Sequence, residues 1–204
     1  MRASTRRELL AGPAGRIECA LDAPQGGLRR GVALVAHPHP LFGGTLDNKV
    51  AQTLARAFVE LGYAALRPNF RGVGGSEGRH DEGSGEVDDL AAVLEWAHAQ
   101  FGAQPLVLAG FSFGAAVQAR LAQRVKPERM VLIGLAVNRF EVPAVPPDTL
   151  LIHGEEDLTV PLAAVLAWAR PQDLPVILVP GADHFFHRRL QVLRTIVQSN
   201  WRAA

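Results

Sequence analysis

The sequence contains little cysteine and no large excess of charge of one sign. Cys19 is the only cysteine among 204 residues, so neither an internal disulfide nor a cysteine metal cluster can form. It lies in the stretch RIECAL with no base beside it, which predicts a buried structural thiol rather than a nucleophile. The formal net charge is +1, with scattered arginines. Charge therefore gives no reason to expect a nucleic acid or an anionic membrane as a partner.

Long hydrophobic runs, repeats and low-complexity linkers are also missing. No stretch approaches 18 uncharged apolar residues, so we expect no membrane-spanning helix. The basic N-terminal stretch MRASTRRELLAG is not followed by a long apolar run, which argues against a secretory signal. With 48% apolar and 20% charged residues, the composition is that of an ordinary globular protein. We expect a cytoplasmic protein in which residues 1–204 form a single domain.

From residue 31 onward, short apolar runs alternate with segments of helical periodicity. The runs expected as strands are residues 31–37, 63–70, 105–111, 129–137, 149–155 and 176–182. The segments expected as helices are residues 48–62, 85–102, 113–125, 161–169 and 188–202. This alternation predicts an α/β fold with a doubly wound, mostly parallel sheet and helices on both faces. The first 30 residues instead indicate two strands joined at residues 12–15, an antiparallel hairpin at the sheet edge.

The pattern G-x-S-x-G occurs twice, around Ser76 in GGSEG and around Ser112 in GFSFG. Ser76 lies in the glycine-rich stretch RGVGGSEGRHDEGSGE, where a helix cannot begin directly at the serine. Ser112 follows the strand PLVLAG and precedes the helix GAAVQARLAQ, as in a nucleophile elbow. We therefore expect Ser112 to be the nucleophile, on strained backbone, with the N–H of Phe113 at the helix N-terminus free to bind an oxyanion.

A serine hydroxyl needs a base to take its proton. His184, in VPGADHFF after the last strand, is the expected base, because it projects from the carboxyl edge of the sheet. His187, three residues further on, is a weaker rival. His153, at the turn after the fifth expected strand of the alternating part, is expected to be structural.

The base in turn needs an acid to hold its tautomer. The segment HGEEDLTVP offers Glu155, Glu156 and Asp157. Asp157 is the preferred acid, because it comes where the loop has cleared the strand. Asp183, beside His184, is an alternative that adjacency disfavours.

The order Ser112, Asp157, His184 is the chain order of α/β-hydrolases, and the sequence resembles that superfamily over nearly its whole length. GFSFG is similar to the nucleophile elbow, HGEEDLTVP to the acid loop, GADHFF to the histidine loop and RPNFRGVGGSEG to the loop after the fourth strand. HPHPLFGGTLDNKV resembles the oxyanion loop, which implies that the N–H of His39 is the second oxyanion donor. Pro38 replaces the usual glycine there and has no N–H.

With its HPHP segment, the sequence resembles a small bacterial subgroup of the superfamily that is close to dienelactone hydrolases and simple esterases. Dienelactone hydrolases carry a cysteine nucleophile, whereas this chain has serine. Where the superfamily commonly inserts a cap, only NRFEVPAVPPD is present, and its three prolines exclude a helical cap. We expect an open, lidless site with walls from Leu41, Phe42, Phe113, Phe140, Leu158 and Phe185.

These residues predict a serine hydrolase that cleaves small-molecule carboxylic esters through an acyl-enzyme, with no cofactor and no metal. His37 and His39 form an H-x-H pair, but no further metal ligand is near them in the sequence. A peptidase, an amidase or an acyltransferase with the same triad is the alternative, followed by a non-catalytic α/β-hydrolase-like binding protein. An exposed last strand could pair two copies into a homodimer.

Overall fold

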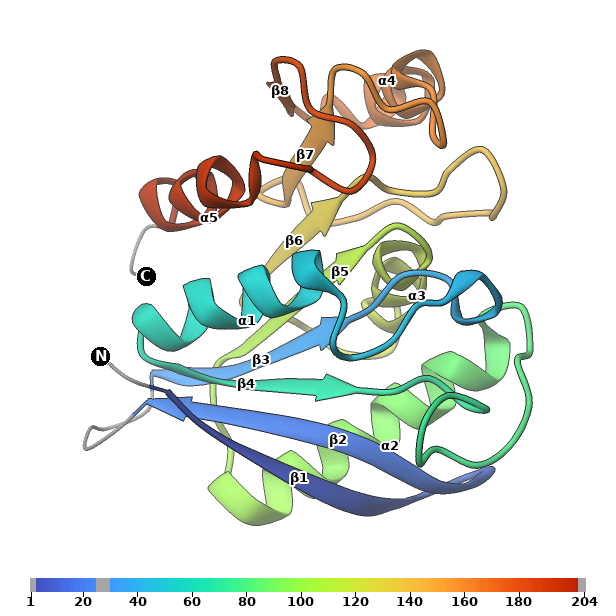
Figure 1. The fold of residues 1–204 in the computed structure, drawn as a ribbon, viewed down its shortest axis with the longest axis vertical. Helices are drawn as coiled ribbons and strands as arrows, with labels where there is room; N and C mark the ends of the chain where they lie inside the picture. The colour runs from blue at the N-terminus through green and yellow to red at the C-terminus, as the bar shows by residue number, and fades with distance from the viewer. Residues whose placement is uncertain (1–2, 25–29, 202–204) are drawn as a thin grey trace.

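The computed structural model describes residues 3–24 and 30–201, and it contains one eight-stranded sheet in the order β1-β2-β4-β3-β5-β6-β7-β8 (Figure 1). The strands are β1 (Ala3–Gly12), β2 (Gly15–Pro24), β3 (Gly31–Ala36), β4 (Tyr63–Pro68), β5 (Leu106–Phe111), β6 (Arg129–Ile133), β7 (Leu150–Gly154) and β8 (Val176–Val179). The α-helices are α1 (Lys49–Glu60), α2 (Ser84–Phe101), α3 (Phe113–Leu121), α4 (Leu162–Ala169) and α5 (Leu190–Ser199), with short 3-10 helices η1 (Pro40–Phe42) and η2 (Arg170–Gln172).

The N-terminal hairpin is confirmed: β1 and β2 pair in antiparallel register from Ala3 opposite Pro24 to Gly12 opposite Gly15. β2 then pairs antiparallel with β4, and all later pairs are parallel. In β3 and β4 every residue is buried. This explains why these strands are continuous apolar runs rather than alternating patterns, since parallel strands are covered on both faces.

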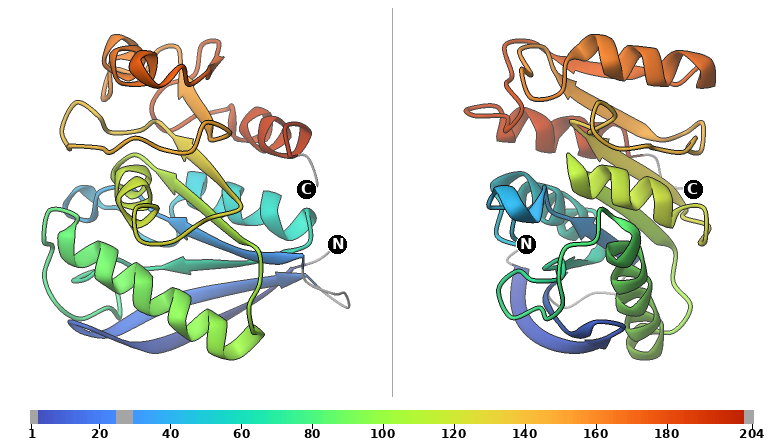
Figure 2. Two further views of the ribbon diagram at one scale, coloured as in Figure 1. Left: turned by 180° about the vertical axis from the view of Figure 1, so that it is seen from behind. Right: turned by 90° about the vertical axis from the view of Figure 1, so that its right-hand side faces the viewer.

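Helices cover both faces of the sheet, as the alternating pattern predicts. Figure 2 shows α1 and α5 on one face and α2, α3 and α4 on the other. The apolar side chains form two core clusters, one on each side of the sheet. Helix α1 begins where the Asn48 side chain accepts hydrogen bonds from the N–H groups of Val50 and Ala51, and its stripe of Leu54 and Phe58 is fully buried.

Several expected boundaries are wrong by two to four residues, and the strand expected over residues 176–182 ends at Val179. The strand expected to run to residue 137 ends at Ile133, because Gly134 adopts φ 51° and turns the chain away. The helix expected to begin at residue 188 begins at Leu190, because Arg188 has φ 59°, which no α-helical residue adopts. The helix expected over residues 113–125 ends at Leu121, before the backbone turn at residues 122–125.

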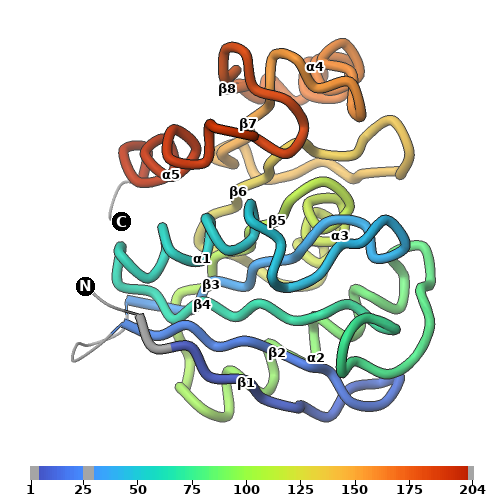
Figure 3. The backbone as a smooth tube through the Cα atoms, in the orientation of Figure 1, coloured from blue at the N-terminus to red at the C-terminus, as the bar shows by residue number. Residues whose placement is uncertain are grey.

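Long segments leave the carboxyl ends of the parallel strands on the same side of the molecule. Figure 3 shows the segments after β3, β4 and β6 on the right of the view, beyond the ends of these strands. Cys19, on β2, is buried, and burial raises the pKa of its thiol to about 12. That thiol is therefore protonated and unreactive at neutral pH, as expected.

In the described part of the chain, no helix is both long enough and apolar enough to cross a membrane.

Candidate active site

Ser112 lies on the sharp turn between β5 and α3. Its backbone has φ 56° and ψ −117°, a left-handed conformation that costs on the order of 1–3 kcal/mol for a residue with a Cβ. The Ser112 N–H donates to the carbonyl of Ile133 at 2.9 Å, which fixes the turn to β6. A Cβ at Gly110 would lie 2.5 Å from the carbonyl oxygen of Gly114, and a Cβ at Gly114 would overlap the carbonyl of His37. Backbone atoms therefore leave no room for a side chain at either glycine.

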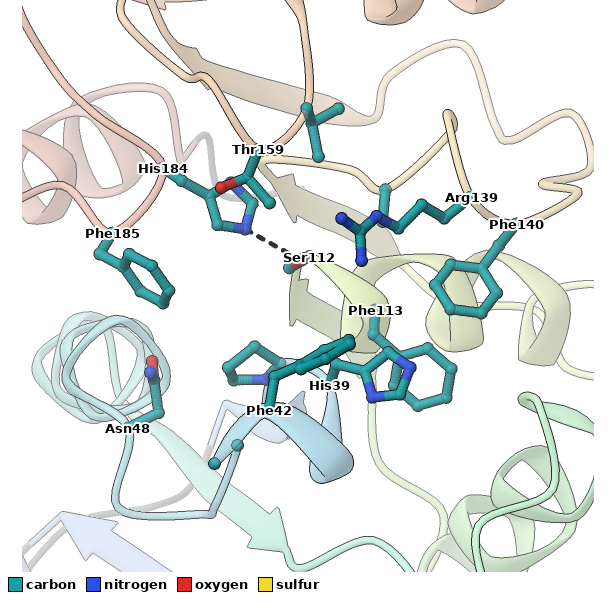
Figure 4. Close-up of a pocket in the computed structure, with 15 residues that line it drawn as sticks. His39, Phe42, Asn48, Ser112, Phe113, Arg139, Phe140, Thr159, His184 and Phe185 are labelled. Atoms are coloured by element: carbon teal, nitrogen blue, oxygen red, sulfur yellow. Dashed lines mark hydrogen bonds between the residues drawn. The ribbon is translucent and has the colours of Figure 1, made fainter.

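Three side chains from three different loops meet at this turn. The Ser112 hydroxyl lies 3.0 Å from Nε2 of His184, and Nδ1 of His184 lies 2.6 Å from Oδ2 of Asp157 (Figure 4 shows the first contact). Because the carboxylate accepts, Nδ1 carries the proton, and Nε2 is left as an acceptor for the serine hydroxyl. The imidazole ring packs against Phe111 at 4.8 Å between centroids, and Gly134 leaves space beside it.

The carboxylate of Asp157 is held by the loop that follows β7. Its Oδ1 accepts from the N–H groups of Thr159 at 2.9 Å and Val160 at 2.8 Å, which leaves Oδ2 to His184. His153 lies behind this loop, fully buried, and its Nε2 donates to the carbonyl of Val160 at 3.0 Å. Burial lowers the pKa of His153. Its Nδ1 has no partner within residues 3–24 and 30–201, so its contribution is to hold the loop in place.

Two backbone N–H groups of the segments that line the cavity, those of His39 and Phe113, have no hydrogen-bond partner among the described residues. Phe113 is the first residue of α3, so its N–H is one of the unpaired donors of the helix N-terminus. His39 precedes η1, and its ring Nδ1 accepts from the N–H of Leu41 at 3.3 Å. Burial, followed by the charge of His80, lowers the pKa of His39. The geometry offers an anion two donors and the positive end of a helix.

His37 holds the segment that carries these donors. Its Nδ1 donates to the carbonyl of Pro38 at 2.7 Å, and its Nε2 accepts from the N–H of Phe70 at 2.9 Å. The ring is fully buried, and burial lowers its pKa to about 4. Both nitrogens are occupied by protein groups, so His37 and His39 are not arranged as a metal-binding pair. Among the described residues, no cluster of three His, Cys, Asp or Glu side chains could hold a metal ion.

A cavity of about 230 Å³ opens above Ser112. Of the expected wall residues, Phe42, Phe113, Phe140 and Phe185 line it (Figure 4). The predictions for Leu41 and Leu158 are wrong: these side chains are 69% and 94% exposed and point away from the cavity into solvent. The sequence reasoning missed the polar lining residues Asn48, Arg139 and Thr159. Arg139 could have been found, because it follows a strand at the carboxyl edge of the sheet.

The rejected candidates have other partners. The hydroxyl of Ser76 accepts from the N–H of Glu18 at 2.9 Å and donates to the carbonyl of Asn69 at 2.8 Å, so it joins two backbone segments. His187 pairs with Asp183 at 2.6 Å, and both side chains are largely exposed.

The remaining two acids of the loop after β7 are exposed. Oε2 of Glu155 accepts from the N–H of Gly181 at 2.9 Å, which ties this loop to the segment that carries His184. Glu156 lies beside it at the surface. Neither acid contacts the His184 ring in the described part of the chain.

The arrangement can therefore perform nucleophilic acyl chemistry. The imidazole can accept the serine proton, the carboxylate can stabilise the imidazolium, and the two N–H groups can stabilise an oxyanion. These groups meet at the floor of an apolar cavity.

Comparisons with known proteins identify the fold and the family. The family model described as alpha/beta hydrolase fold matches residues 39–142. The structure of an α/β serine hydrolase without a lid from Xanthomonas campestris is 39% identical, with a TM-score of 0.90, over 98% of this chain and 94% of that one. An α/β serine hydrolase homologue from Coxiella burnetii is 38% identical, with a TM-score of 0.88, over 97% of both chains. An uncharacterised protein from Rickettsia prowazekii is 33% identical over 88% of this chain and 82% of that protein.

Proposed function

The chain belongs to the α/β-hydrolase family, and from this premise we propose that it is a serine hydrolase that cleaves carboxylic esters of small substrates. The observation that carries the proposal is the chain of hydrogen bonds from Ser112 through His184 to Asp157 at the floor of an apolar cavity. The two unpaired N–H groups beside the serine support it, because an acyl transfer needs donors where negative charge develops.

In the proposed mechanism, His184 takes the proton of Ser112 as the serine oxygen attacks the ester carbonyl carbon. The N–H groups of Phe113 and His39 stabilise the oxyanion, each by roughly 2.7–4 kcal/mol. Asp157 stabilises the imidazolium, which then gives its proton to the leaving alcohol. Water attacks the acyl-enzyme with His184 again as base, which releases the acid and restores the serine.

An ester is favoured over an amide by the openness of the site. No segment within residues 30–201 forms a helical cap over Ser112, and the loop between β6 and β7 contains no helix. Without such a cap, the site excludes water poorly during the reaction. An alcohol departs more readily than an amine from such a site, because its departure depends less on complete protonation.

The test is an activity panel on the purified protein. Matched esters, thioesters, lactones and amides of one acyl group are offered, with acyl chains of increasing length. We expect hydrolysis of short-chain esters and no measurable cleavage of the amides. Amide cleavage at a comparable rate would favour a peptidase or an amidase instead.

An acyltransferase is a second candidate that the open cavity allows, because an acceptor other than water can reach the acyl-enzyme. Addition of alcohols or amines to the ester assay separates the two, since a transferase forms the new ester or amide at low acceptor concentration.

Two further expectations stay predictions: that two copies pair along the edge strand β8, and that the protein is cytoplasmic.

A further inference from the structure

Arg139 carries the one formal charge among the Asp, Glu, Lys and Arg side chains in the described lining of the cavity. Figure 4 shows its side chain directed into the cavity toward Ser112, from the loop after β6. Its guanidinium carbon lies 5.8 Å from the centroid of the Phe42 ring. No carboxylate oxygen of the described residues lies within 4.0 Å of its nitrogens. An exposed cation therefore lies at the wall of the cavity without a carboxylate of the described residues to neutralise it.

The loop that carries Arg139 is fixed to the rest of the site. The Asn138 side chain donates to the carbonyl of Thr159 at 3.0 Å, which ties this loop to the loop of Asp157. The N–H groups of Arg139 and Phe140 both donate to the carbonyl of Ala136. The Phe140 ring packs on Phe113 at 5.0 Å between centroids. The backbone position of Arg139 is thus set by contacts on both sides.

The two acids that act electrostatically on His39, another lining residue, have other partners. Glu86 is fully buried and accepts from the N–H groups of Asp81 and Gly83 and contacts His80 at 2.9 Å. Glu82 lies 3.5 Å from the other ring nitrogen of His80. These acids are therefore engaged with His80 and the start of α2.

The proposed mechanism fixes which part of an ester would meet Arg139. The leaving oxygen must face Nε2 of His184 to receive a proton, and the carbonyl oxygen must face the N–H of Phe113. The acyl chain takes the remaining direction. Figure 4 shows Arg139 and Phe140 on one side of Ser112 and His184 and Phe185 on the other. The acyl chain therefore extends toward Arg139, and the alcohol part toward Phe185.

We propose that the preferred substrates are half-esters of short dicarboxylic acids, whose free carboxylate is bound by Arg139. This inference rests on the proposed function. The guanidinium can hold a carboxylate through two parallel hydrogen bonds, while the apolar walls take the methylene groups. Hydrolysis breaks the ester C–O bond and joins the water oxygen to the acyl carbon. The products are a dicarboxylate, the alcohol and one proton.

The test compares monoethyl succinate, glutarate and adipate with the corresponding diethyl esters, by titration of the acid released at constant pH and ionic strength. The quantity of interest is the ratio of kcat/KM for the half-ester to that for the diester. We expect Arg139→Gln to lower this ratio by about two- to fivefold, since Arg139 is exposed and solvent weakens a charge pair there. Arg139→Lys should lower it less, because the charge remains without the paired geometry.

The matched control is Arg56→Gln, which removes one positive charge from the exposed face of α1, outside the cavity. It should leave the ratio unchanged. In a second measurement, glutarate should inhibit diethyl ester hydrolysis competitively in the wild type, with an inhibition constant about two- to fivefold higher in Arg139→Gln.

An unchanged ratio in Arg139→Gln, or an equal fall for both substrates, would overturn this inference while leaving the ester hydrolase intact. A similar fall in Arg56→Gln would overturn it too, because general charge would then explain the effect. Failure of the wild type to hydrolyse any of the diesters or half-esters would instead remove the proposed function on which it rests.

Discussion

Ser112 and Ser76 occupy the same five-residue pattern, and both are less than 9% exposed, but their hydroxyl groups face different partners. The hydroxyl of Ser112 faces the imidazole of His184 and a cavity. The hydroxyl of Ser76 faces two backbone groups, the N–H of Glu18 on β2 and the carbonyl of Asn69 after β4. One hydroxyl has a base that can take its proton, and the other joins the N-terminal hairpin to the body of the sheet.

The glycines of the two segments also serve different purposes. Gly110 and Gly114 are required because backbone atoms of α3 and β3 lie where a Cβ would be. Gly74 and Gly78 have φ values of 56° and 87°, which glycine adopts without strain, and side chains are what crowd them. Glycine thus allows close packing of a helix on a strand in the segment around Ser112, and a reversing loop in the segment around Ser76.

The largest expected difference between the two serines is in activity. Ser112→Ala should lower kcat/KM for a short-chain ester by at least about 10⁴-fold, because the nucleophile is lost and only binding and the oxyanion donors remain. Ser76→Ala should stay within about threefold of the wild type, because its hydroxyl touches no reacting group. Steady-state kinetics on both variants measure this. A comparable loss in Ser76→Ala would remove the distinction.

The next largest effect concerns the glycines. Gly114→Ala should lower the free energy of unfolding by about 3 kcal/mol, because its Cβ would overlap the carbonyls of Ala36 and His37, which belong to the packed sheet edge. Gly78→Ala should cost about 1–2 kcal/mol, mainly from the left-handed backbone. Urea denaturation of both variants gives the comparison. Equal losses in the free energy of unfolding would show that backbone crowding at Gly114 does not distinguish the turn at Ser112 from the loop around Ser76.

His37 joins the two regions, since it contacts Pro38 before the oxyanion donors and Phe70 in the loop that leads to Ser76. Burial lowers its pKa from 6.5 to about 4, so the unfolded chain binds its proton first as the pH falls. The contribution of neutral His37 to the free energy of unfolding is fully present above pH 6.5. It is lost as the pH falls from 6.5 to about 4, which lowers the free energy of unfolding by about 3 kcal/mol.

Denaturation at a series of pH values tests this, with His37→Gln as the comparison. The variant should be less stable at neutral pH and should lose less stability between pH 6.5 and 4 than the wild type. Identical slopes in the two proteins would mean that His37 does not titrate in this range.

Ser76→Ala should lower the stability of the protein, although it leaves the activity nearly unchanged. Removal of the hydroxyl leaves the N–H of Glu18 and the carbonyl of Asn69 without their partner, which should cost about 1–3 kcal/mol. Thermal or urea unfolding measures it. A variant as stable as the wild type would show that the hydroxyl does not fasten the hairpin to the loop.

Sequence pattern predicted the order of strands and helices, because buried parallel strands and amphipathic helices have different apolar spacing. It did not predict that β4 lies between β2 and β3, since strand order depends on how the layers pack. It also misplaced the ends of β6 and the start of α5, where Gly134 and Arg188 adopt positive φ values that no periodicity reveals.

Within the site, the sequence pattern around Ser112 was the most informative, because a strand, a sharp turn and a helix constrain one another. The residues of the cavity walls were harder to predict from the sequence. Leu41 and Leu158 were expected in the cavity but point into solvent, and Arg139 was not expected but points inward. A loop has no repeat that fixes the direction of a side chain, so its hydrogen bonds, such as that of Asn138 to Thr159, decide it.

The most direct test of Ser112 as the nucleophile is the reaction of the folded protein with a fluorophosphonate, followed by mass analysis of the intact protein and its peptides. We expect one adduct, on Ser112, which Ser112→Ala abolishes, His184→Ala strongly slows and Ser76→Ala leaves unchanged. No adduct on the folded wild type, or an adduct on any residue other than Ser112, would contradict it.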